Sequence, residues 1–229
     1  MKFISRLSAL IAVSLCISTL STSAISDSAY AIKEHGNSHM KIALTFDDGP
    51  HPRYTAQILD ILKEYGVRAT FFVIGENAKK HPELIEREIN EGHEIGNQTY
   101  SHIKLPSANE AVCEYEIEQT QRIIWEISEY RAKLIRPPEG RCSKAVNAIA
   151  EEDGYSVILW SLDTEDWKHR SVSEITSYVL ENTSAGDIIL CHDFIGGDSP
   201  TPQALRVIIP TLLERGFNFV TVSELINTN

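Results

Sequence analysis

The sequence predicts an α/β fold in a single domain, with about seven parallel strands that alternate with helices. Short runs rich in β-branched and aromatic residues are separated by longer amphipathic runs, which is typical of strand–helix–strand units with right-handed crossovers. No repeat, low-complexity tract or second domain interrupts this pattern after residue 40. A barrel-like closure and an open doubly wound sheet both fit the order. No Gly-x-Gly-x-x-Gly follows the first strand, so a dinucleotide-binding sheet loses its main support.

The strands are predicted from residue types that favour a pleated, largely buried surface. In chain order they are KIALTFD at 41–47, ATFFVIG at 69–75, HEIGNQT at 93–99, KLIRPP at 133–138, SVILWSLD at 156–163, DIILCHD at 187–193 and FNFVTV at 217–222. The helices are predicted from apolar residues that recur at helical intervals. They cover residues 55–65, 82–92, 109–130, 143–154, 172–183 and 202–216.

Residues 1–31 are predicted to be a secretory signal peptide. Lys2 and Arg6 precede an apolar run over 7–20, and small residues ending at Ala31 provide a cleavage site. The apolar run is shorter than the ~20 residues that span a bilayer, so a cleaved export signal is favoured over a retained anchor. A polar lead-in over 32–40 and a globular domain over 41–229 follow. We therefore expect a secreted or cell-wall-associated protein with no membrane span after cleavage.

The net charge limits the classes of binding partner, and the cysteine content limits the disulfides that the chain can form. The formal net charge is −11, and no basic stripe with interleaved aromatic residues is present, which argues against nucleic-acid binding. Beyond the signal segment, Cys113, Cys142 and Cys191 are widely spaced and odd in number, so they form no disulfide framework and no Cys-x-x-Cys motif. Buried thiols are expected, with a single disulfide left open. The protein is expected to be a monomer.

Ionisable and metal-binding side chains gather where the predicted strands end. The strand ends carry Asp47 and Asp48; Gln98 and His102; Arg136 and Pro138; Asp163, Asp166 and Trp167; and His192 and Asp193. Each group alone has an ordinary interpretation as a turn, a solvated loop or a helix cap. In barrels of parallel strands, however, the carboxyl ends of the strands share one rim, and chemistry is found there. The accumulation favours a functional site.

The residue types suit hydrolysis assisted by a cation. Adjacent carboxylates at a strand end diverge, so one of them can bind a cation while the other faces a metal-bound water. A neutral imidazole such as His102 suits a zinc-type ion beside an aspartate. A second imidazole, His192, can donate a proton to a leaving group from the other side.

Five motifs in order, TFDDGP, GNQTYSH, RPPEG, DTEDW and LCHD, resemble those of the polysaccharide deacetylases of carbohydrate esterase family four, the NodB-type deacetylase domain. The resemblance covers nearly all of residues 41–229, which it identifies as the catalytic domain. It implies a distorted (β/α) barrel that uses a divalent metal ion to hydrolyse N-acetyl, and sometimes O-acetyl, groups on polysaccharides.

The resemblance also implies a role for each matching residue. Asp47 is the general base, and Arg136 holds it in place and keeps it ionised. Asp48 and His102 are metal ligands, and Gln98 stands at the third ligand position. The remaining implied roles are the general acid His192, its orienting partner Asp163, and the substrate-binding residues Trp167, Leu190, Pro138 and Tyr100.

Two residues depart from the family pattern. Gln98 replaces a metal-binding histidine, and Glu139 replaces an aromatic residue after the two prolines. An amide oxygen is a weaker ligand than imidazole for zinc-like ions. Zinc is therefore expected to bind more weakly, or the preference to shift toward cobalt, manganese or magnesium, or the site to be empty. Glu139 is expected to point into solvent.

These observations predict an exported, metal-dependent hydrolase that removes N-acetyl groups from amino-sugar polysaccharides, with peptidoglycan ahead of chitin oligomers. The main alternative is a catalytically silenced family member that binds glycans, because loss of the metal removes the acidified water. Xylan O-acetyl esters, and a different amide such as a cyclic imide, are weaker alternatives.

Overall fold

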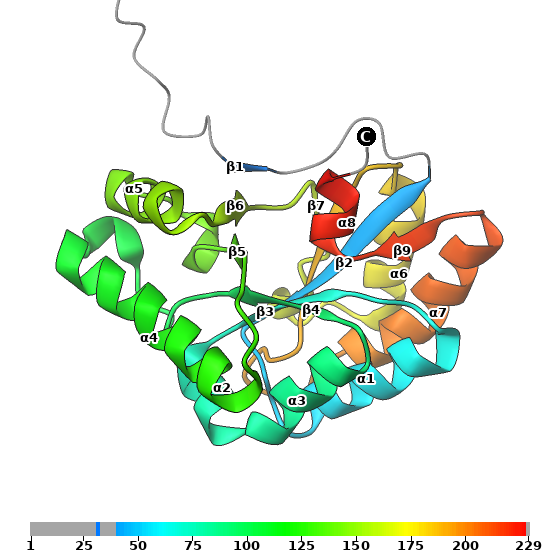
Figure 1. The fold of residues 1–229 in the computed structure, drawn as a ribbon. Helices are drawn as coiled ribbons and strands as arrows, with labels where there is room; N and C mark the ends of the chain where they lie inside the picture. The colour runs from blue at the N-terminus through cyan, green and yellow to red at the C-terminus, as the bar shows by residue number, and fades with distance from the viewer. Residues whose placement is uncertain (1–30, 33–39, 228–229) are drawn as a thin grey trace, which may run out of the picture.

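A curled parallel sheet forms the centre of the structure, a computed structural model that describes residues 31–32 and 40–227 (Figure 1). The predicted signal peptide up to residue 30 and most of the polar lead-in lie outside the described residues. The strands are β1 (Ala31–Ile32), β2 (Lys41–Asp47), β3 (Thr70–Val73), β4 (Glu94–Asn97), β5 (Leu134–Ile135), β6 (Ser156–Ile158), β7 (Leu162–Asp163), β8 (Ile188–His192) and β9 (Asn218–Val220). Every pairing between them is parallel, which confirms the predicted α/β class.

The connection between β6 and β7 shows that the sheet is strongly curled, so that its two edges come near each other. The strand order is β1-β6-β5-β4-β3-β2-β8-β7, with β9 pairing β2, so β6 and β7 lie toward opposite ends. Only residues 159–161 join them, and a link of that length spans at most ~14 Å. Within it, the Leu159 amide donates to Ile32 O (2.8 Å), whereas the Ser161 amide donates to Ile188 O (3.0 Å). The predicted strand over 156–163 is therefore divided between two edges, and the fold is the distorted barrel rather than an open sheet.

Helices surround this sheet, and all but the last of them lie on its outside (Figure 1). They are α1 (Tyr54–Tyr65), α2 (Gly75–Lys80), α3 (Pro82–Asn90), α4 (Glu110–Ser128), α5 (Lys144–Asp153), α6 (Val172–Asn182), α7 (Thr201–Glu214) and α8 (Val222–Ile226), with short 3₁₀ turns at Leu105–Ser107, Pro138–Gly140 and Asp166–Lys168. Two of these helices were not predicted. α2 directly follows β3, and α8 begins inside the predicted last strand, which ends at Val220.

Successive side chains of a strand point alternately to the core under the helices and to the interior of the barrel, as the two-residue period of a strand requires. On β2, Leu44 and Phe46 belong to the large cluster under the helices, whereas Ala43 belongs to a separate inner cluster that also holds Val222 and Leu225 of α8. Asp47 shares the face of Ala43. The interior is therefore apolar near the start of β2 and polar at its carboxyl end.

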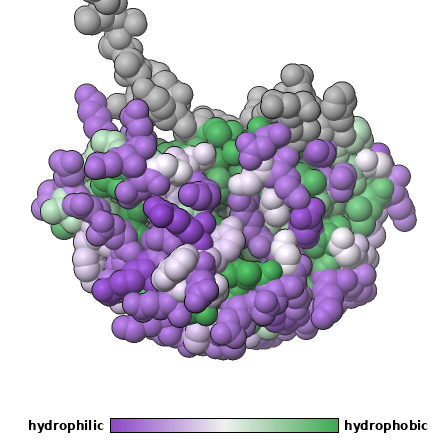
Figure 2. Space-filling model, viewed as in Figure 1, coloured by the Kyte–Doolittle hydropathy of each residue, from purple (hydrophilic) through white to green (hydrophobic). Residues whose placement is uncertain are grey.

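The visible surface is mainly hydrophilic, and hydrophobic residues appear chiefly in recessed places (Figure 2). Within residues 31–32 and 40–227, no helix has the length and apolar character needed to cross a membrane.

Gly96 on β4 leaves room for an aromatic ring that supports the polar end of the barrel. A Cβ at Gly96 would lie 2.4 Å from Cδ1 of Phe72, its partner on β3, and the Phe72 ring carries the Arg136 guanidinium 3.9 Å from its centre. We expect Gly96→Ala to displace the ring and lower the free energy of unfolding by about 1–3 kcal/mol, the usual cost of overpacking. Denaturant unfolding monitored by circular dichroism measures the change. An unaltered unfolding free energy would contradict this packing.

Candidate active site

One pocket at the carboxyl ends of the strands brings most of the predicted site residues together. It has a volume of about 450 Å³. Its lining residues are Asp47, Asp48, Gln98, His102, Glu139, Trp160, Asp163, Trp167, Leu190 and His192. Trp160 and Glu139 lie in the pocket although the sequence did not mark them as site residues. Trp160 follows β6 in the link to β7, a position that no motif indicated.

Asp47 is held by a fully buried ion pair. Nη1 of Arg136, which has no exposed surface, donates to Asp47 Oδ1 (2.6 Å) and to the Thr45 hydroxyl (2.8 Å). The remaining donors of Arg136 bond the carbonyl oxygens of Ile158 and Leu159. Burial raises the pKa of Asp47, and the charge of Arg136 offsets part of that rise. The carboxylate is thereby fixed in position and made more basic than an exposed aspartate.

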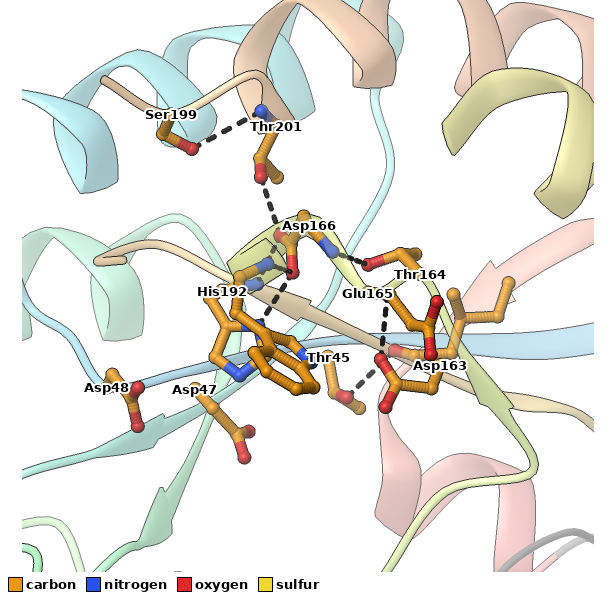
Figure 3. A network of polar contacts seen from close by, with 12 residues as sticks. Thr45, Asp47, Asp48, Asp163, Thr164, Glu165, Asp166, His192, Ser199 and Thr201 are labelled. Atoms are coloured by element: carbon orange, nitrogen blue, oxygen red, sulfur yellow. Dashed lines mark hydrogen bonds and ion pairs between the residues drawn. The ribbon is translucent and has the colours of Figure 1, made fainter. Parts of the chain in front are cut away.

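His192 is oriented by Asp166 and not by Asp163. The His192 Nδ1 atom lies 2.7 Å from Asp166 Oδ1, and the His192 amide donates to Asp166 Oδ2 (2.8 Å), which also accepts the Thr201 hydroxyl (2.6 Å). Asp166 lies between His192 and Thr201 in Figure 3. Asp163 instead accepts the Glu165 amide (2.8 Å), because Glu165 turns the chain with a φ of 53°. The predicted orienting role of Asp163 is wrong.

The imidazole of His192 is poised as a proton donor. Burial lowers its pKa, but the hydrogen bond and charge of Asp166, together with the carboxylates of Asp47 and Asp48, raise it to about 9. Burial raises the pKa of Asp166 in turn, and its bonds to His192 and Thr201 reverse that effect, so the net shift is downward. Near neutral pH the pair is an imidazolium beside a carboxylate.

Gln98 presents its amide nitrogen to the two carboxylates of the DDGP turn. The Gln98 Nε2 atom donates to Asp47 Oδ2 (3.1 Å) and Asp48 Oδ1 (3.0 Å), and Oε1 accepts the Asp48 backbone amide (2.7 Å). The opposite orientation would place Oε1 against two carboxylates and Nε2 against an N–H, so the hydrogen-bond partners fix the assignment. The amide nitrogen lies where a cation would neutralise these carboxylates.

The donor set does not fit a zinc-type ion. His102 Nε2 lies 3.2 Å from Asp48 Oδ1, so these two groups converge as predicted. The only oxygen that Gln98 offers is engaged by a backbone amide, and its nitrogen has no lone pair to give. A catalytic zinc site needs three protein ligands. Among the described residues, no group of three or more His, Cys, Asp or Glu side chains is placed to hold a metal ion. Gln98 is not a ligand in this arrangement.

Several residues around the pocket have left-handed backbone conformations. The φ angles of Asp48, Thr99 and His102 are 73°, 70° and 56°, which is uncommon for residues other than glycine. Such conformations persist only where their surroundings fix them, and they cluster at functional sites. Gly49 is required next to them, because a Cβ there would lie 2.0 Å from Asp193 Oδ2. Asp193 is therefore packed under the turn and does not line the pocket.

Two predicted substrate-binding residues lie outside the pocket lining. Tyr100 makes an edge contact with Tyr115 on α4, with ring centres 6.2 Å apart, and Pro138 is buried in the 3₁₀ turn after β5. The next residue, Glu139, lines the pocket instead. As expected it is exposed to solvent, with 43% of its side chain accessible, and its carboxylate lies 3.3 Å from Lys104 Nζ and 3.7 Å from Arg141 Nη1. The predicted free thiols are confirmed for Cys113, Cys142 and Cys191; Cys113 and Cys191 are buried as expected, whereas Cys142 is only partly buried.

Known proteins resemble this chain in sequence and in fold. The family model described as polysaccharide deacetylase matches residues 25–158. A peptidoglycan-N-acetylglucosamine deacetylase of Bacillus cereus is 43% identical over 190 residues, covering 82% of this chain and 69% of the relative. A chitooligosaccharide deacetylase of Sinorhizobium fredii is 36% identical, covering 81% of this chain and 92% of the relative.

Solved structures share this curled-barrel fold. The Bc1960 peptidoglycan N-acetylglucosamine deacetylase superposes with a TM-score of 0.83 at 41% identity, covering 86% of this chain and 92% of that one. A Bacillus anthracis protein described as a family pseudoenzyme, BA3943, gives a TM-score of 0.80 at 28% identity over 86% and 69% of the two chains, and a mutant of it is described as having restored activity. A Clostridium thermocellum acetyl xylan esterase in complex with cobalt gives a TM-score of 0.74 at 34% identity over 81% and 89%.

The ion pair between His192 and Asp166 predicts how the imidazole titrates. Asp166→Asn removes the charge that raises the pKa of His192, so we expect that pKa to fall from about 9 toward its ordinary 6.5. Because the native pKa is raised, the ion pair stabilises the fold fully below pH 6.5, and this contribution is lost as the pH rises through about 9. NMR titration of the His192 ring measures the shift. Asp163→Asn is the matched control and should leave the His192 pKa nearly unchanged; equal shifts in both variants would contradict the assignment of Asp166.

The orientation of Gln98 predicts weak metal binding that one substitution reverses. Gln98→His replaces the amide with a third ligand beside Asp48 and His102. We expect zinc affinity to rise by more than about a hundredfold, the upper range for loss of an outer-shell partner. Calorimetric titration with zinc measures the affinity, and Gln98→Leu, which removes the amide without adding a ligand, is the control. Equal affinities in the native protein and Gln98→His would show that residue 98 does not face the ion site.

Proposed function

This chain belongs to the polysaccharide deacetylase family, and we propose that it is an exported N-deacetylase of amino-sugar polysaccharides, with peptidoglycan ahead of chitin oligomers. The observation that carries the proposal is the pairing of two separately held proton-transfer groups at one pocket: Asp47 on Arg136, and His192 on Asp166. A base and an acid with different environments on either side of a cleft are what amide hydrolysis requires.

The relatives support the choice of substrate. Peptidoglycan-N-acetylglucosamine deacetylases are 43% and 41% identical to this chain, whereas the chitooligosaccharide deacetylase is 36% identical. The N-terminal features of residues 1–31 predict export, and in a bacterium peptidoglycan is the acetylated polymer met outside the membrane. We therefore place the protein outside the cell or at the cell wall, as a monomer without a nucleic-acid partner.

The pocket residues divide the chemical work between two sides. Asp47 accepts a proton from the attacking water, and Arg136 keeps the resulting acid oriented. His192 then donates its Nε2 proton to the departing amine, because Nδ1 is held by Asp166. The side chains of Trp167 and Leu190 line the wall where the acetyl methyl group would lie. Acid–base catalysis of this kind contributes about 10²- to 10⁴-fold.

Turnover is proposed to be slow, because the donor set lacks the third metal ligand. A bound divalent ion would supply Lewis-acid chemistry at the acetyl carbonyl. Gln98 offers a neutral N–H donor near that position instead. The family resemblance implies an activity that depends on a metal ion. We propose that the Gln98→His variant has this dependence and that the native chain does not.

One observation favours a second candidate function, glycan binding without turnover. The Gln98 amide satisfies both carboxylates and leaves neither of them aimed at a water bound to an ion. A structural neighbour of the same fold is described as a pseudoenzyme, so the fold accommodates loss of activity. This candidate predicts glycan binding that a chelator does not affect.

An acetate-release assay on peptidoglycan and on N-acetylglucosamine oligomers separates the two candidates. We expect slow release by the native protein, faster release by zinc-loaded Gln98→His, and a loss of about a hundredfold or more in Asp47→Asn, because the general base is removed. Glu64→Gln, which alters an exposed ion pair with Arg206, is the control and should keep the native rate. Binding without acetate from either the native protein or Gln98→His would favour the silenced family member.

A further inference from the structure

A second groove lies in the outer layer, between α4 and the segment that joins α5 to β6, toward the amino ends of the strands. Its volume is about 470 Å³, and its lining residues are Glu118, Gln121, Arg122, Trp125, Arg131, Asp153 and Tyr155. None of them lines the reactive pocket. Helix α4 leaves the carboxyl end of β4 and leads to the start of β5, so its last turns lie beside the amino ends of the strands. Tyr155 immediately precedes β6, which places this wall of the groove at the same end.

The floor and back wall of the groove are fixed by hydrogen bonds. Gln121 Oε1 accepts both the Tyr155 hydroxyl (3.1 Å) and the Ala132 backbone amide (3.1 Å), and Gln121 Nε2 donates to the Tyr130 carbonyl oxygen (3.3 Å). These bonds hold the Tyr155 ring and the loop after α4 in one arrangement. The groove therefore needs little ordering when a ligand enters.

An aromatic side chain borders this fixed wall. Trp125 on α4 is 52% exposed, an unusual degree for the largest side chain in a protein. The apolar face of a pyranose ring, made of C–H groups, packs on an indole of this kind, while the indole retains its large contact area at little cost in conformational entropy.

The acidic and basic groups of the groove are equal in number, and Arg122 among them is engaged from outside the groove: it donates to Gln119 Oε1 (2.6 Å) and lies 3.8 Å from Glu126 Oε1. Two carboxylates, from Glu118 and Asp153, and two guanidinium groups, from Arg122 and Arg131, line it. Across residues 31–32 and 40–227, no hydrogen bond or ion pair engages the side chains of Glu118, Arg131 or Asp153. A net charge near zero favours neither an anionic polymer nor a cation. Unengaged donors and acceptors around an aromatic ring suit the hydroxyl and acetamido groups of a neutral sugar.

We propose that this groove is a second, non-catalytic binding site for a pyranose unit of an N-acetylated glycan chain. The class of ligand rests on the proposed function, whereas the site itself rests on the groove. No counterpart of the Asp47 and His192 pair lies among its lining residues, so it binds without hydrolysis. Two separate binding sites on one domain allow the protein to remain on an insoluble polymer while the reactive pocket samples neighbouring sugars, because the second contact becomes intramolecular.

The distribution of tryptophan makes the proposal directly testable. The chain has three tryptophans: Trp125 lines the groove, and Trp160 and Trp167 line the reactive pocket. Protein labelled with 5-fluorotryptophan should give one ¹⁹F signal for each, assigned through single substitutions to Phe. On titration with the N-acetylglucosamine tetramer, we expect the Trp125 and Trp167 signals to move with separate saturation curves.

Each result decides one of the two proposals. Movement of Trp167 alone overturns the groove site and leaves the proposed function standing. Movement of Trp125 alone supports the groove and counts against substrate binding in the reactive pocket. If neither signal moves, the groove site is overturned together with binding of this class of glycan.

A variant pair tests what the groove does. We expect Trp125→Ala to weaken cosedimentation with insoluble peptidoglycan about tenfold, as loss of a stacked aromatic contact implies. Its acetate release from a soluble dimer should stay at the native rate, because Trp125 is remote from the pocket. Tyr178→Ala removes an exposed aromatic ring from α6, outside the groove, and should leave cosedimentation unchanged. Equal retention of the two variants would overturn the proposed role.

Discussion

The buried ion pair between Arg136 and Asp47 is the interaction on which the rest of the site depends. The guanidinium is withdrawn from solvent, lies against the Phe72 ring, and bonds the carbonyl oxygens of Ile158 and Leu159 as well as the carboxylate. Arg136 thereby connects β2 to the end of β6 and to the link that follows it. Breaking one partner of a buried pair costs about 3–5 kcal/mol, because the other charge is left uncompensated. Asp47 is thus positioned by the same side chain that connects β2 to the end of β6 and the following link.

The exchange at residue 98 alters the electrostatics of the pocket without dismantling it. Two neighbouring carboxylates need positive potential nearby, and Gln98 supplies it as a pair of N–H dipoles rather than as an ion. Asp47 and His192 keep their positions, because Arg136 and Asp166 hold those groups independently of residue 98. What the amide cannot supply is an electrophile. In this fold the positions of the pocket side chains do not depend on a bound electrophile such as a metal ion. A protein with this fold can therefore keep the barrel and its pocket and still differ in the reaction rate that it supports.

Much of this arrangement could be predicted from the sequence. Strand composition gave the order of elements, and the rule that chemistry lies at the carboxyl ends of parallel strands brought Asp47, Asp48, His102 and His192 into one pocket. The errors arose where the direction of a side chain is set by tertiary contacts. Asp163 and Asp166 differ by three residues in one motif, and only the turn at Glu165 decides which of them meets His192. Likewise Tyr100 packs on α4, and the amide of Gln98 is oriented by a backbone N–H fifty residues away.

The short link between β6 and β7 has a consequence for selectivity. Residues 159–161 join two edges of the sheet, and Trp160 within them lines the reactive pocket while its ring lies 5.6 Å from the Arg136 guanidinium. The link sets the distance between these two edges and fixes Trp160 in the wall of the pocket. The width of the pocket beside Trp160 is therefore limited by covalent chain length, and lengthening this link would change which ligands fit there without altering a single reactive group.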